Sequence, residues 1–436
     1  MNREPLILVC TCEIAGRLRG KGFPARELPE RLVKGVGWVP TNTMISAFGP
    51  IGDTPFGATD DLALVPDPAC EIHVDFGDGS APEHFFLGDI RETDGKFWAC
   101  CPRDFLRRAL AALDRVAGLR LYAAFEQEFV YTGVEDLPGS PYSLDAYRRQ
   151  GIFGEVFTAA LRRAGLTPES FLAEYGARQY EATSAPAIGL KAADDAVVLR
   201  EIARASAQRL GQRAIFSPIL DPKGTGSGVH IHMSFIDEDN EPAMHDPAEP
   251  YGLSRPAREF MAGVLKHLPA ICAVTAPSTI SYIRLTPNRW APTYAYIADR
   301  DREASLRICP VLTLPGASDA ARQFNVEFRP ADGAASPYLA LGAIINAGVD
   351  GMRHGLELPE PRDVARMSEA ERQAAGIRHL PRSLTEALDH LEATHEAKEW
   401  FGPVYLDAYL RHKRAEIRML EGLDEAAQCA RYALTY

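Results

Sequence analysis

The segment LYAAFEQEFVYTG, residues 121–133, is an apolar run interrupted by two acidic side chains, Glu126 and Glu128. Its content of Phe, Tyr, Val and Leu, together with the closing Gly133, predicts a β-strand. Because successive side chains of a strand point to opposite faces, the two carboxylates lie on the same side. Two half-buried like charges repel each other unless a cation intervenes. The simpler alternative is an edge strand with a solvated acidic face.

The same spacing of two residues recurs in two other predicted strands. His230 and His232 are spaced in this way in GVHIHMSF, and so are Glu327 and Arg329 in NVEFRP. Buried polar groups need partners, so three strands that each present two of them on one face indicate a shared polar interior. Carboxylates and histidine together predict a metal site in that interior.

Composition narrows the class of protein. The chain has 436 residues, 46% of them hydrophobic and 24% charged, with a formal net charge of −12. The hydrophobic and charged fractions are typical of a globular enzyme. The negative net charge and the lack of a basic run argue against nucleic acid or an anionic membrane as a partner. No apolar stretch approaches the roughly 18 residues of a membrane span, and the N-terminal segment lacks the pattern of a signal peptide. We therefore predict a cytoplasmic protein.

The texture of the sequence changes near residue 100. Residues 1–100 are short β-like pieces broken by loops rich in Gly and Pro, with almost no helical periodicity. Residues 101–436 mix helices and strands, which predicts an α+β fold with a small β-rich N-terminal domain and a large second domain. Helices are expected at 101–119, 143–164, 192–211, 337–354 and from about 380 onward, and strands at 213–220, 228–236 and 323–330.

Further polar candidates lie outside the three strands. Glu174 and Glu181 flank EYGARQYE, a predicted loop or short strand, although surface acids are the alternative. The GTGSG run before His230 allows a ligand to approach the backbone closely, but it matches neither a phosphate loop nor a dinucleotide fingerprint.

Arginines complete the set of candidates. Four of them lie in apolar or turn-like contexts, and each alone is consistent with a surface or structural role: Arg284, Arg302, Arg307 and Arg329. Arginine binds carboxylates and phosphates in a bidentate manner. Several carboxylates with a histidine can hold two divalent ions, while several arginines hold anionic substrates. This combination indicates phosphoryl transfer to an acidic substrate.

Six segments, in this order, resemble those of the glutamine synthetase family over about residues 85–415: FEQEFVY, EYGARQYE, GTGSGVHIHMSF, SYIRLTPNRWAP, DREASLRICP and NVEFRPADGAASPYLA. The resemblance implies a β-grasp-like N-terminal domain at residues 1–100. It implies a catalytic domain at 101–436, built on a curved antiparallel sheet with flanking helices. It further implies ATP as co-substrate, glutamate as the acid, two Mg²⁺ or Mn²⁺ ions per active site, and a homo-oligomer, a dodecamer of two hexameric rings.

The resemblance also implies roles for individual residues. One ion would be held by Glu128, Glu174 and Glu181, and the ion that bridges the ATP phosphates by Glu126, His230 and Glu327. Substrate carboxylates would be bound by Arg284 and Arg329, with backbone contact from Gly226. The transferring phosphate and nucleotide would be bound by Arg302 and Arg307, with His232 and Ser234 on the nucleotide side.

The sequence departs from the family pattern at the ammonium site. Family members typically carry P-G-Y-E-A-P where this chain reads PNRWAP, so Trp290 stands in place of the acidic residue that assists ammonium deprotonation. An indole cannot accept a proton, but its face attracts an alkylammonium. Thr225 and Asn325 also replace a common Asn and a common Arg, respectively. We therefore predict a ligase that transfers a γ-glutamyl group from its phosphate to an organic amine.

Three alternatives remain at this stage. The enzyme could use ammonia through a displaced base, as a glutamine synthetase does. The chain could be a non-catalytic structural or regulatory relative, although binding alone gives no reason for two metal sites. The acid could differ from glutamate, because Arg284 and Arg329 require a carboxylate without defining its chain length.

Overall fold

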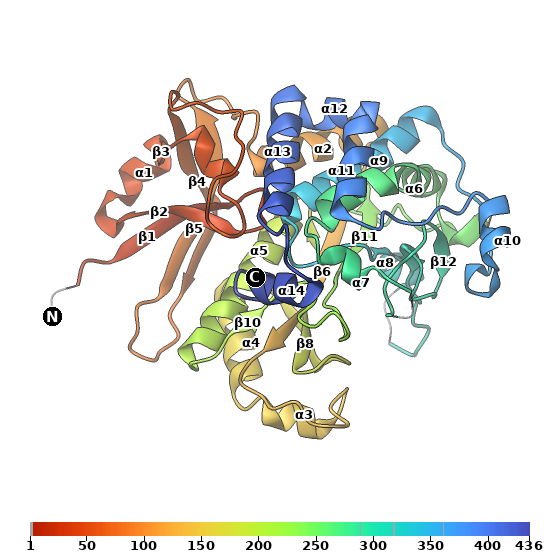
Figure 1. Ribbon diagram of the computed structural model, residues 1–436, viewed down its shortest axis with the longest axis horizontal. Helices are drawn as coiled ribbons and strands as arrows, with labels where there is room; N and C mark the ends of the chain where they lie inside the picture. Colours follow the sequence, from red (N-terminus) through yellow and green to blue (C-terminus); the bar gives the residue numbers. More distant parts are fainter. Residues whose placement is uncertain (1–2, 288, 317–318, 361) are drawn as a thin grey trace.

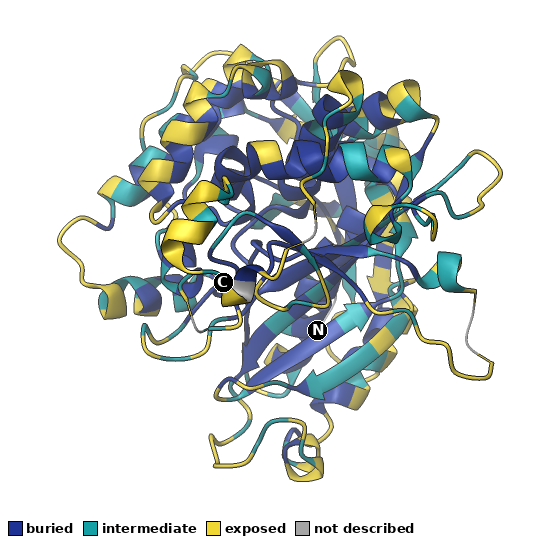
Figure 2. Ribbon diagram, turned by 90° about the vertical axis from the view of Figure 1, so that its right-hand side faces the viewer, coloured by how far each residue is buried: buried dark blue, intermediate teal, exposed yellow. Residues whose placement is uncertain are grey.

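A computed structural model describes residues 3–287, 289–316, 319–360 and 362–436. The chain folds into a small N-terminal domain and a larger helix-rich part, each organised around its own β-sheet (Figure 1). Buried segments lie inside the molecule, while exposed helix faces, loops and parts of the N-terminal strands form its surface (Figure 2). The predicted α+β fold with a small N-terminal domain is confirmed.

The N-terminal sheet has the strand order β2-β1-β5-β4-β3. Its middle pair, β1 and β5, is parallel, and the remaining pairs are antiparallel, which is a β-grasp-like arrangement. The single α-helix here, α1 (Leu28–Lys34), was not predicted from the sequence. The strands are β1 Leu6–Cys12, β2 Leu18–Pro24, β3 Val36–Trp38, β4 Leu62–Val74 and β5 Glu83–Glu92.

The large sheet has the order β12-β13-β14-β11-β6-β8-β7, with the short strands β9 and β10 also pairing with β6. Every described pair in it is antiparallel except β12 with β13. The strands are β6 Arg120–Tyr131, β7 Pro168–Ala173, β8 Gln179–Ser184, β9 Ala187–Ile188, β10 Ala214–Ile215, β11 Val229–Ile236, β12 Ile297–Asp299, β13 Leu306–Ile308 and β14 Val326–Phe328.

Helices cover this sheet, and α9 is the most deeply buried long helix among them, packing against both α2 and α6. Its apolar character on nearly all sides explains this central position. The described helices after the first are α2 Pro102–Ala117, α3 Leu144–Arg149, α4 Phe153–Arg163, α5 Leu190–Arg209, α6 Arg255–Thr275, α7 Ser281–Arg284, α8 Ala320–Gln323, α9 Pro337–His354, α10 Glu369–Ala374, α11 Leu384–Ala393, α12 His395–Phe401, α13 Pro403–Arg418 and α14 Glu425–Ala433.

Strand β6 lies inside the sheet, between β11 and β8, so the edge-strand interpretation of its two glutamates is wrong. Its odd-numbered side chains are buried beneath the sheet. Among them, Gln127 donates to the Ala196 carbonyl oxygen at 3.0 Å and accepts from Arg200 Nε at 2.5 Å, both on α5. These two bonds fix the far side of the strand, and so Glu126 and Glu128 emerge together on the opposite face.

Some predicted elements differ from the structure. The helix expected at 143–164 is two helices, α3 and α4, separated at Gly151, whose φ of 64° cannot continue a helix. The strand expected at 213–220 pairs only at Ala214 and Ile215, because the Phe216 amide instead donates to the Tyr436 carbonyl oxygen. Strand β14 is likewise shorter than expected.

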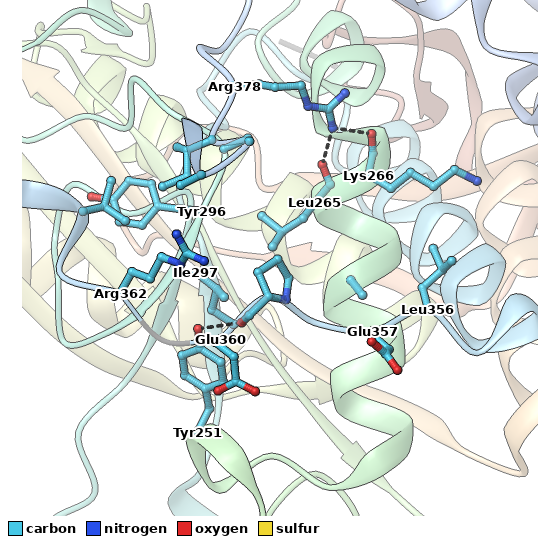
Figure 3. Close-up of a pocket in the computed structure, with 17 residues that line it drawn as sticks. Tyr251, Leu265, Lys266, Tyr296, Ile297, Leu356, Glu357, Glu360, Arg362 and Arg378 are labelled. Atoms are coloured by element: carbon cyan, nitrogen blue, oxygen red, sulfur yellow. Dashed lines mark hydrogen bonds between the residues drawn. The ribbon is translucent and has the colours of Figure 1, made fainter. Parts of the chain in front are cut away.

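Helix α6 was missed, and it contains Pro269 in its interior. Proline supplies no N–H, so the Leu265 carbonyl one turn earlier loses its helical partner. Arg378 replaces the missing donor: its Nη2 lies 3.2 Å from the Leu265 oxygen and 3.0 Å from the Lys266 oxygen, at the wall of a cavity of about 350 Å³ (Figure 3). A side chain distant in sequence therefore stabilises this helix.

Arg103 joins the two parts of the chain. It lies on α2 with none of its side chain exposed, and its nitrogens approach three carboxylates at 2.9–3.0 Å. Asp67 and Asp89 belong to the N-terminal sheet, and Asp194 belongs to α5. An arginine surrounded by carboxylates satisfies the requirement that a buried charge be paired, and this network fixes the N-terminal domain against α2 and α5.

Candidate active site

The pairing register of the large sheet brings the predicted site residues together. Strand β6, with Glu126 and Glu128, lies between β11, with His230 and His232, and β8, with Glu181. Strand β14, with Glu327, lies on the other side of β11. Side chains directly opposite on antiparallel strands lie within contact distance. The register opposes Glu126 and His230, Glu128 and Glu181, His232 and Glu327, and Arg307 and Glu327.

One cluster consists of Glu126, His230 and Glu327, whose candidate ligand atoms all lie within 4.8 Å of one another. His230 Nδ1 is 2.7 Å from Glu126 Oε1 and 3.4 Å from Glu327 Oε1. Burial would raise the pKa of Glu126, but hydrogen bonds with His230 and His232 hold it well below its usual range. Burial would also raise the pKa of Glu327, which nearby His230 and Arg329 lower to about 2. Both carboxylates are therefore ionised at neutral pH.

A second acidic group, Glu128, Glu174 and Glu181, lines one cleft, but among the described residues it is not one of the groups whose candidate ligand atoms all lie within 4.8 Å of one another. Burial, followed by the charges of Glu126 and Glu128, raises the pKa of Glu181 to about 10. Burial also raises the pKa of Glu128, whose Oε2 accepts from the Gly228 amide at 2.7 Å. Carboxylates crowded in this way favour a bound cation, because a divalent ion removes the repulsion that otherwise forces a proton onto one of them. The donor set fits a hard divalent ion such as Mg²⁺ or Mn²⁺.

Apart from Glu327, these acids and His230 line a cleft of about 910 Å³ that also contains three of the four candidate arginines, Arg284, Arg302 and Arg329. Arg284 is buried and donates from Nη2 to the Ala331 carbonyl oxygen at 2.7 Å. Arg329 forms an ion pair with Glu327 and donates to the Trp290 carbonyl oxygen at 3.2 Å. The Nε atoms of Arg284 and Arg329 are buried and find no hydrogen-bond partner among the described residues. Unpaired cationic donors beside a cleft suit an anionic ligand.

The residues predicted for the nucleotide side lie further along the same sheet. His232 Nδ1 is 2.9 Å from Asn325 Oδ1, and Arg307 Nη1 is 2.7 Å from Glu327 Oε2. Ser234 lies opposite Tyr122 on β6. The described residues that line the cleft include exposed Arg302 but not His232, Ser234 or Arg307. The structure thus places His232 and Arg307 beside the cluster of Glu126, His230 and Glu327, and not at the open cleft.

Gly226 has a steric role as well as a predicted ligand contact. A Cβ atom added to it would lie 2.4 Å from Arg284 Cγ and 3.0 Å from the Pro218 carbonyl oxygen, so only glycine fits there. Its own carbonyl oxygen accepts from Gln179 Nε2 at 2.9 Å. The same amide nitrogen also reaches Glu128 Oε2 at 3.1 Å and Ser227 Oγ at 3.0 Å. Gln179 therefore connects the glycine-rich loop to the acidic group.

Trp290 lines the cleft and is 60% exposed, with a φ of 55°. Asn288 of the same PNRWAP segment lies outside the described residues. The sequence reasoning missed Gln179, Tyr142 and Tyr175, all of which also line the cleft. Gln179 had a usable signal, because it is spaced two residues from Glu181 on β8, like the three recognised pairs. Tyr142 and Tyr175 lie in loops, where the sequence shows no such spacing.

Comparison with known proteins identifies the class to which this fold and site belong. Residues 99–432 match the family model described as glutamine synthetase, catalytic domain, and residues 2–98 match the model of the glutamine synthetase N-terminal domain. The chain belongs to the glutamine synthetase family. It is a ligase that forms carbon–nitrogen bonds, which excludes the non-catalytic alternative.

Individual relatives cover nearly the whole chain. A gamma-glutamylpolyamine synthetase, GlnA3, of Streptomyces coelicolor is 34% identical over 99% of this chain and 93% of its own length. A glutamine synthetase of Pyrococcus horikoshii is 31% identical over 95% of this chain and 90% of its own length. A crystal structure described as a novel glutamine synthase homolog superposes with a TM-score of 0.92 and is 39% identical, covering 100% of this chain and 99% of that one. The relatives therefore include enzymes named glutamine synthetase and an enzyme named gamma-glutamylpolyamine synthetase.

No helix among the described residues is both long and apolar enough to cross a membrane.

Proposed function

We propose that this enzyme is a γ-glutamyl–amine ligase, which uses ATP to convert glutamate to a γ-glutamyl phosphate and transfers the acyl group to an organic amine. The observation that supports it most directly is Trp290, which lines the cleft beside Arg329 where ammonia-using relatives place an acid. An indole favours a carbon-bearing amine over ammonia, because its face contacts alkyl groups and attracts substituted ammonium. The 34% identical relative, named as a gamma-glutamylpolyamine synthetase, agrees with an amine acceptor.

In this proposal two divalent ions, Mg²⁺ or Mn²⁺, complete the site. One would be held by Glu128, Glu174 and Glu181, and the other by Glu126, His230 and Glu327. Such ions supply neutralisation of the negative charge that develops on the transferring phosphate. The crowding that raises the pKa of Glu181 to about 10 supports this assignment, since the chain alone places more negative charge there than it can balance.

Arg284 and Arg329 bind the carboxylates of glutamate, and their unpaired buried Nε atoms support that role. The Gly226 backbone contacts the substrate, and the missing side chain lets Arg284 pack against this loop, because a Cβ atom there would lie 2.4 Å from Arg284 Cγ. Exposed Arg302 extends into the cleft as the catalytic contact to the phosphoryl group. Arg307, His232 and Ser234 bind the nucleotide. Arg307 also has a buried Nε without a partner among the described residues, which fits an anionic ligand.

The reaction proceeds in two displacements. The γ-carboxylate oxygen of glutamate attacks the terminal phosphorus of ATP, which releases ADP and leaves an acyl phosphate. The neutral amine nitrogen then attacks the acyl carbon, inorganic phosphate leaves, and the amine proton passes to a base. The arginines hold glutamate and ATP in a fixed relative orientation. This increases the rate, because the two reactants no longer have to meet by diffusion in the right orientation.

An ADP-release assay with glutamate and a panel of acceptors tests the proposal. The panel comprises ammonia, monoamines, polyamines and amino alcohols, and we expect the organic amines to have the higher kcat/KM. Ammonia as the best acceptor would establish the ammonia-using alternative instead. Replacing glutamate by acids of shorter and longer chain in the same assay tests the identity of the acid.

Trp290→Glu is the matched variant, because it restores the acid of the ammonia-using pattern. We expect it to raise the ratio of ammonia to organic amine turnover. Circular dichroism controls for folding, and unchanged acceptor preference in a folded variant would remove Trp290 from the acceptor site.

We further propose that the chain works in the cytoplasm as a dodecamer of two hexameric rings, with a domain boundary near residue 100. The family is usually oligomeric, and the two family-model matches meet between residues 98 and 99. Mass photometry of the purified protein tests the assembly, and a species other than a dodecamer would refute it.

A further inference from the structure

Three aromatic side chains from separate loops meet at one wall of the cleft. Tyr142 precedes α3, Tyr175 follows β7, and Trp290 follows α7. The ring centroids of Tyr142 and Tyr175 are 5.3 Å apart in an edge-to-face arrangement, and those of Tyr175 and Trp290 are 5.5 Å apart. These separations are those of interacting aromatic pairs, so the rings form one continuous surface.

The three rings remain accessible although they contact one another. Tyr142 is 58% exposed, Tyr175 56% and Trp290 60%, whereas large aromatic side chains are ordinarily buried to a much greater extent. All three line the same cleft as Arg284 and Glu128. A contiguous exposed aromatic surface at a cleft wall marks a binding surface for a ligand.

Two of the rings are held in an unfavourable backbone conformation. Tyr142 has a φ of 53° and Trp290 a φ of 55°, in the left-handed region that bulky residues rarely adopt. The Tyr142 amide donates to the Ala173 carbonyl oxygen at 3.0 Å, and Arg329 donates to the Trp290 carbonyl oxygen. Strained residues that the surroundings hold in place concentrate at ligand sites, because the strain preserves a functional orientation.

The ring faces at this wall suit an alkylammonium group. The Tyr142 hydroxyl donates to Glu174 Oε1 at 2.7 Å, which orients that ring, while the Glu174 carboxylate is assigned above to a divalent ion. Lys223 and Arg289 also line the cleft, and the two terminal nitrogens of Arg289 donate to the carbonyl oxygens of Gly224 and Pro222. Aromatic faces attract alkylammonium groups through the ring quadrupole.

We propose that Tyr142, Tyr175 and Trp290 form a subsite for the distal ammonium group of a diamine or polyamine acceptor. This inference rests on the proposed function and narrows its substrate class. An attacking nitrogen must be neutral to use its lone pair, whereas the far nitrogen of a diamine stays protonated near neutral pH. The rings bind that second, charged nitrogen while the first reaches the acyl phosphate. A monoamine of equal length lacks the group that the subsite recognises.

The test compares 1,4-diaminobutane with n-butylamine, which have the same carbon chain and differ only in the distal amine. We expect the wild-type kcat/KM to be about tenfold higher for the diamine, the size of a cation–π contact in a partly desolvated site. In Tyr175→Leu and Trp290→Leu this ratio falls toward one, and Tyr175→Phe, which keeps the ring, restores most of it. Tyr147→Leu, an exposed tyrosine on α3, is the matched control and retains the wild-type ratio.

The outcomes separate this inference from the proposed function. Organic amines that exceed ammonia, with equal turnover of butylamine and diaminobutane, would refute the subsite and leave the ligase intact. A diamine preference that survives both leucine variants would also refute it. Ammonia exceeding every amine would refute the proposed function itself. Thermal denaturation of each variant excludes loss of folding as the cause of a changed ratio.

Discussion

Replacing Glu181 with glutamine is expected to stabilise the metal-free protein and to remove most of its stabilisation by Mn²⁺. Burial and the neighbouring charges of Glu126 and Glu128 raise the pKa of Glu181 from 4.5 to about 10. A carboxyl group whose pKa is raised by folding does not lower the free energy of unfolding at a pH below its unfolded pKa. It lowers it increasingly as the pH rises toward the folded pKa. For Glu181 this loss of stability grows between about pH 4.5 and pH 10.

The magnitude follows from this shift. At pH 7, about 2.5 units above the ordinary pKa of 4.5, the raised pKa lowers the free energy of unfolding by an amount on the order of 3 kcal/mol, at about 1.4 kcal/mol per unit. Glutamine carries no charge, so the variant does not lose this stability. Bound ion acts in the opposite direction: at 100 times its dissociation constant it stabilises the wild type by about 2.7 kcal/mol, and the variant loses one ligand for it.

Urea denaturation with EDTA or with Mn²⁺, at pH 5 and pH 8, measures both effects. We expect Glu181→Gln to exceed the wild type in free energy of unfolding with EDTA at pH 8, with a gain of less than about 1 kcal/mol at pH 5. Adding Mn²⁺ should narrow the difference, because it stabilises the wild type more than the variant. Glu169→Gln, at the exposed position of β7, is the control and should behave as the wild type. Destabilisation of the EDTA-treated variant, or equal stabilisation of both proteins by Mn²⁺, would show that Glu181 is neither crowded nor an ion ligand.

Four further substitutions test other parts of the structure. Arg103→Met should lower the free energy of unfolding by about 3–5 kcal/mol, because it leaves buried carboxylates without their shared cation; urea denaturation against the exposed control Arg115→Met measures this. Glu126→Ala should chiefly raise the KM for ATP and Glu128→Ala chiefly slow acyl transfer, and wild-type kinetics in either would contradict the assigned roles. Gln179→Leu should raise the KM for glutamate about tenfold, since it removes the amide that positions Glu128 and Gly226, and steady-state kinetics decide it.

The sequence predicts which side chains of each strand in the site share one face, because the alternation of faces every two residues is a local property of an extended chain. The spacing in FEQEF, HIH and EFR therefore identified which side chains share a side. The pairing register could not be predicted this way, since it depends on which strands become neighbours. Only the structure places Glu128 opposite Glu181 and Glu126 opposite His230.

The missed features depend on contacts between distant segments. Pro269 normally argues against a helix interior, but in α6 Arg378 binds the Leu265 carbonyl that the proline leaves free, together with the next carbonyl, that of Lys266. Tyr142 and Tyr175 lie in separate loops, where the sequence has no periodic pattern. Only the folded chain determines that they meet. Local patterns thus predict the faces of strands, whereas residues on loops require the folded chain.

The division between strands and loops has a consequence for protein engineering. Most of the acids and histidines of the site lie on β6, β8, β11 and β14, with Glu174 as the exception, whereas the aromatic rings lie in loops 132–143, 174–178 and 285–296. A one-residue slip in a strand would turn every ligand away from its partners, but a loop can change length or composition without moving the ladder. Exchange of these loops between relatives, with Glu174 retained as an ion ligand, offers a route to new amide products that leaves the ATP-dependent activation of the acid in place.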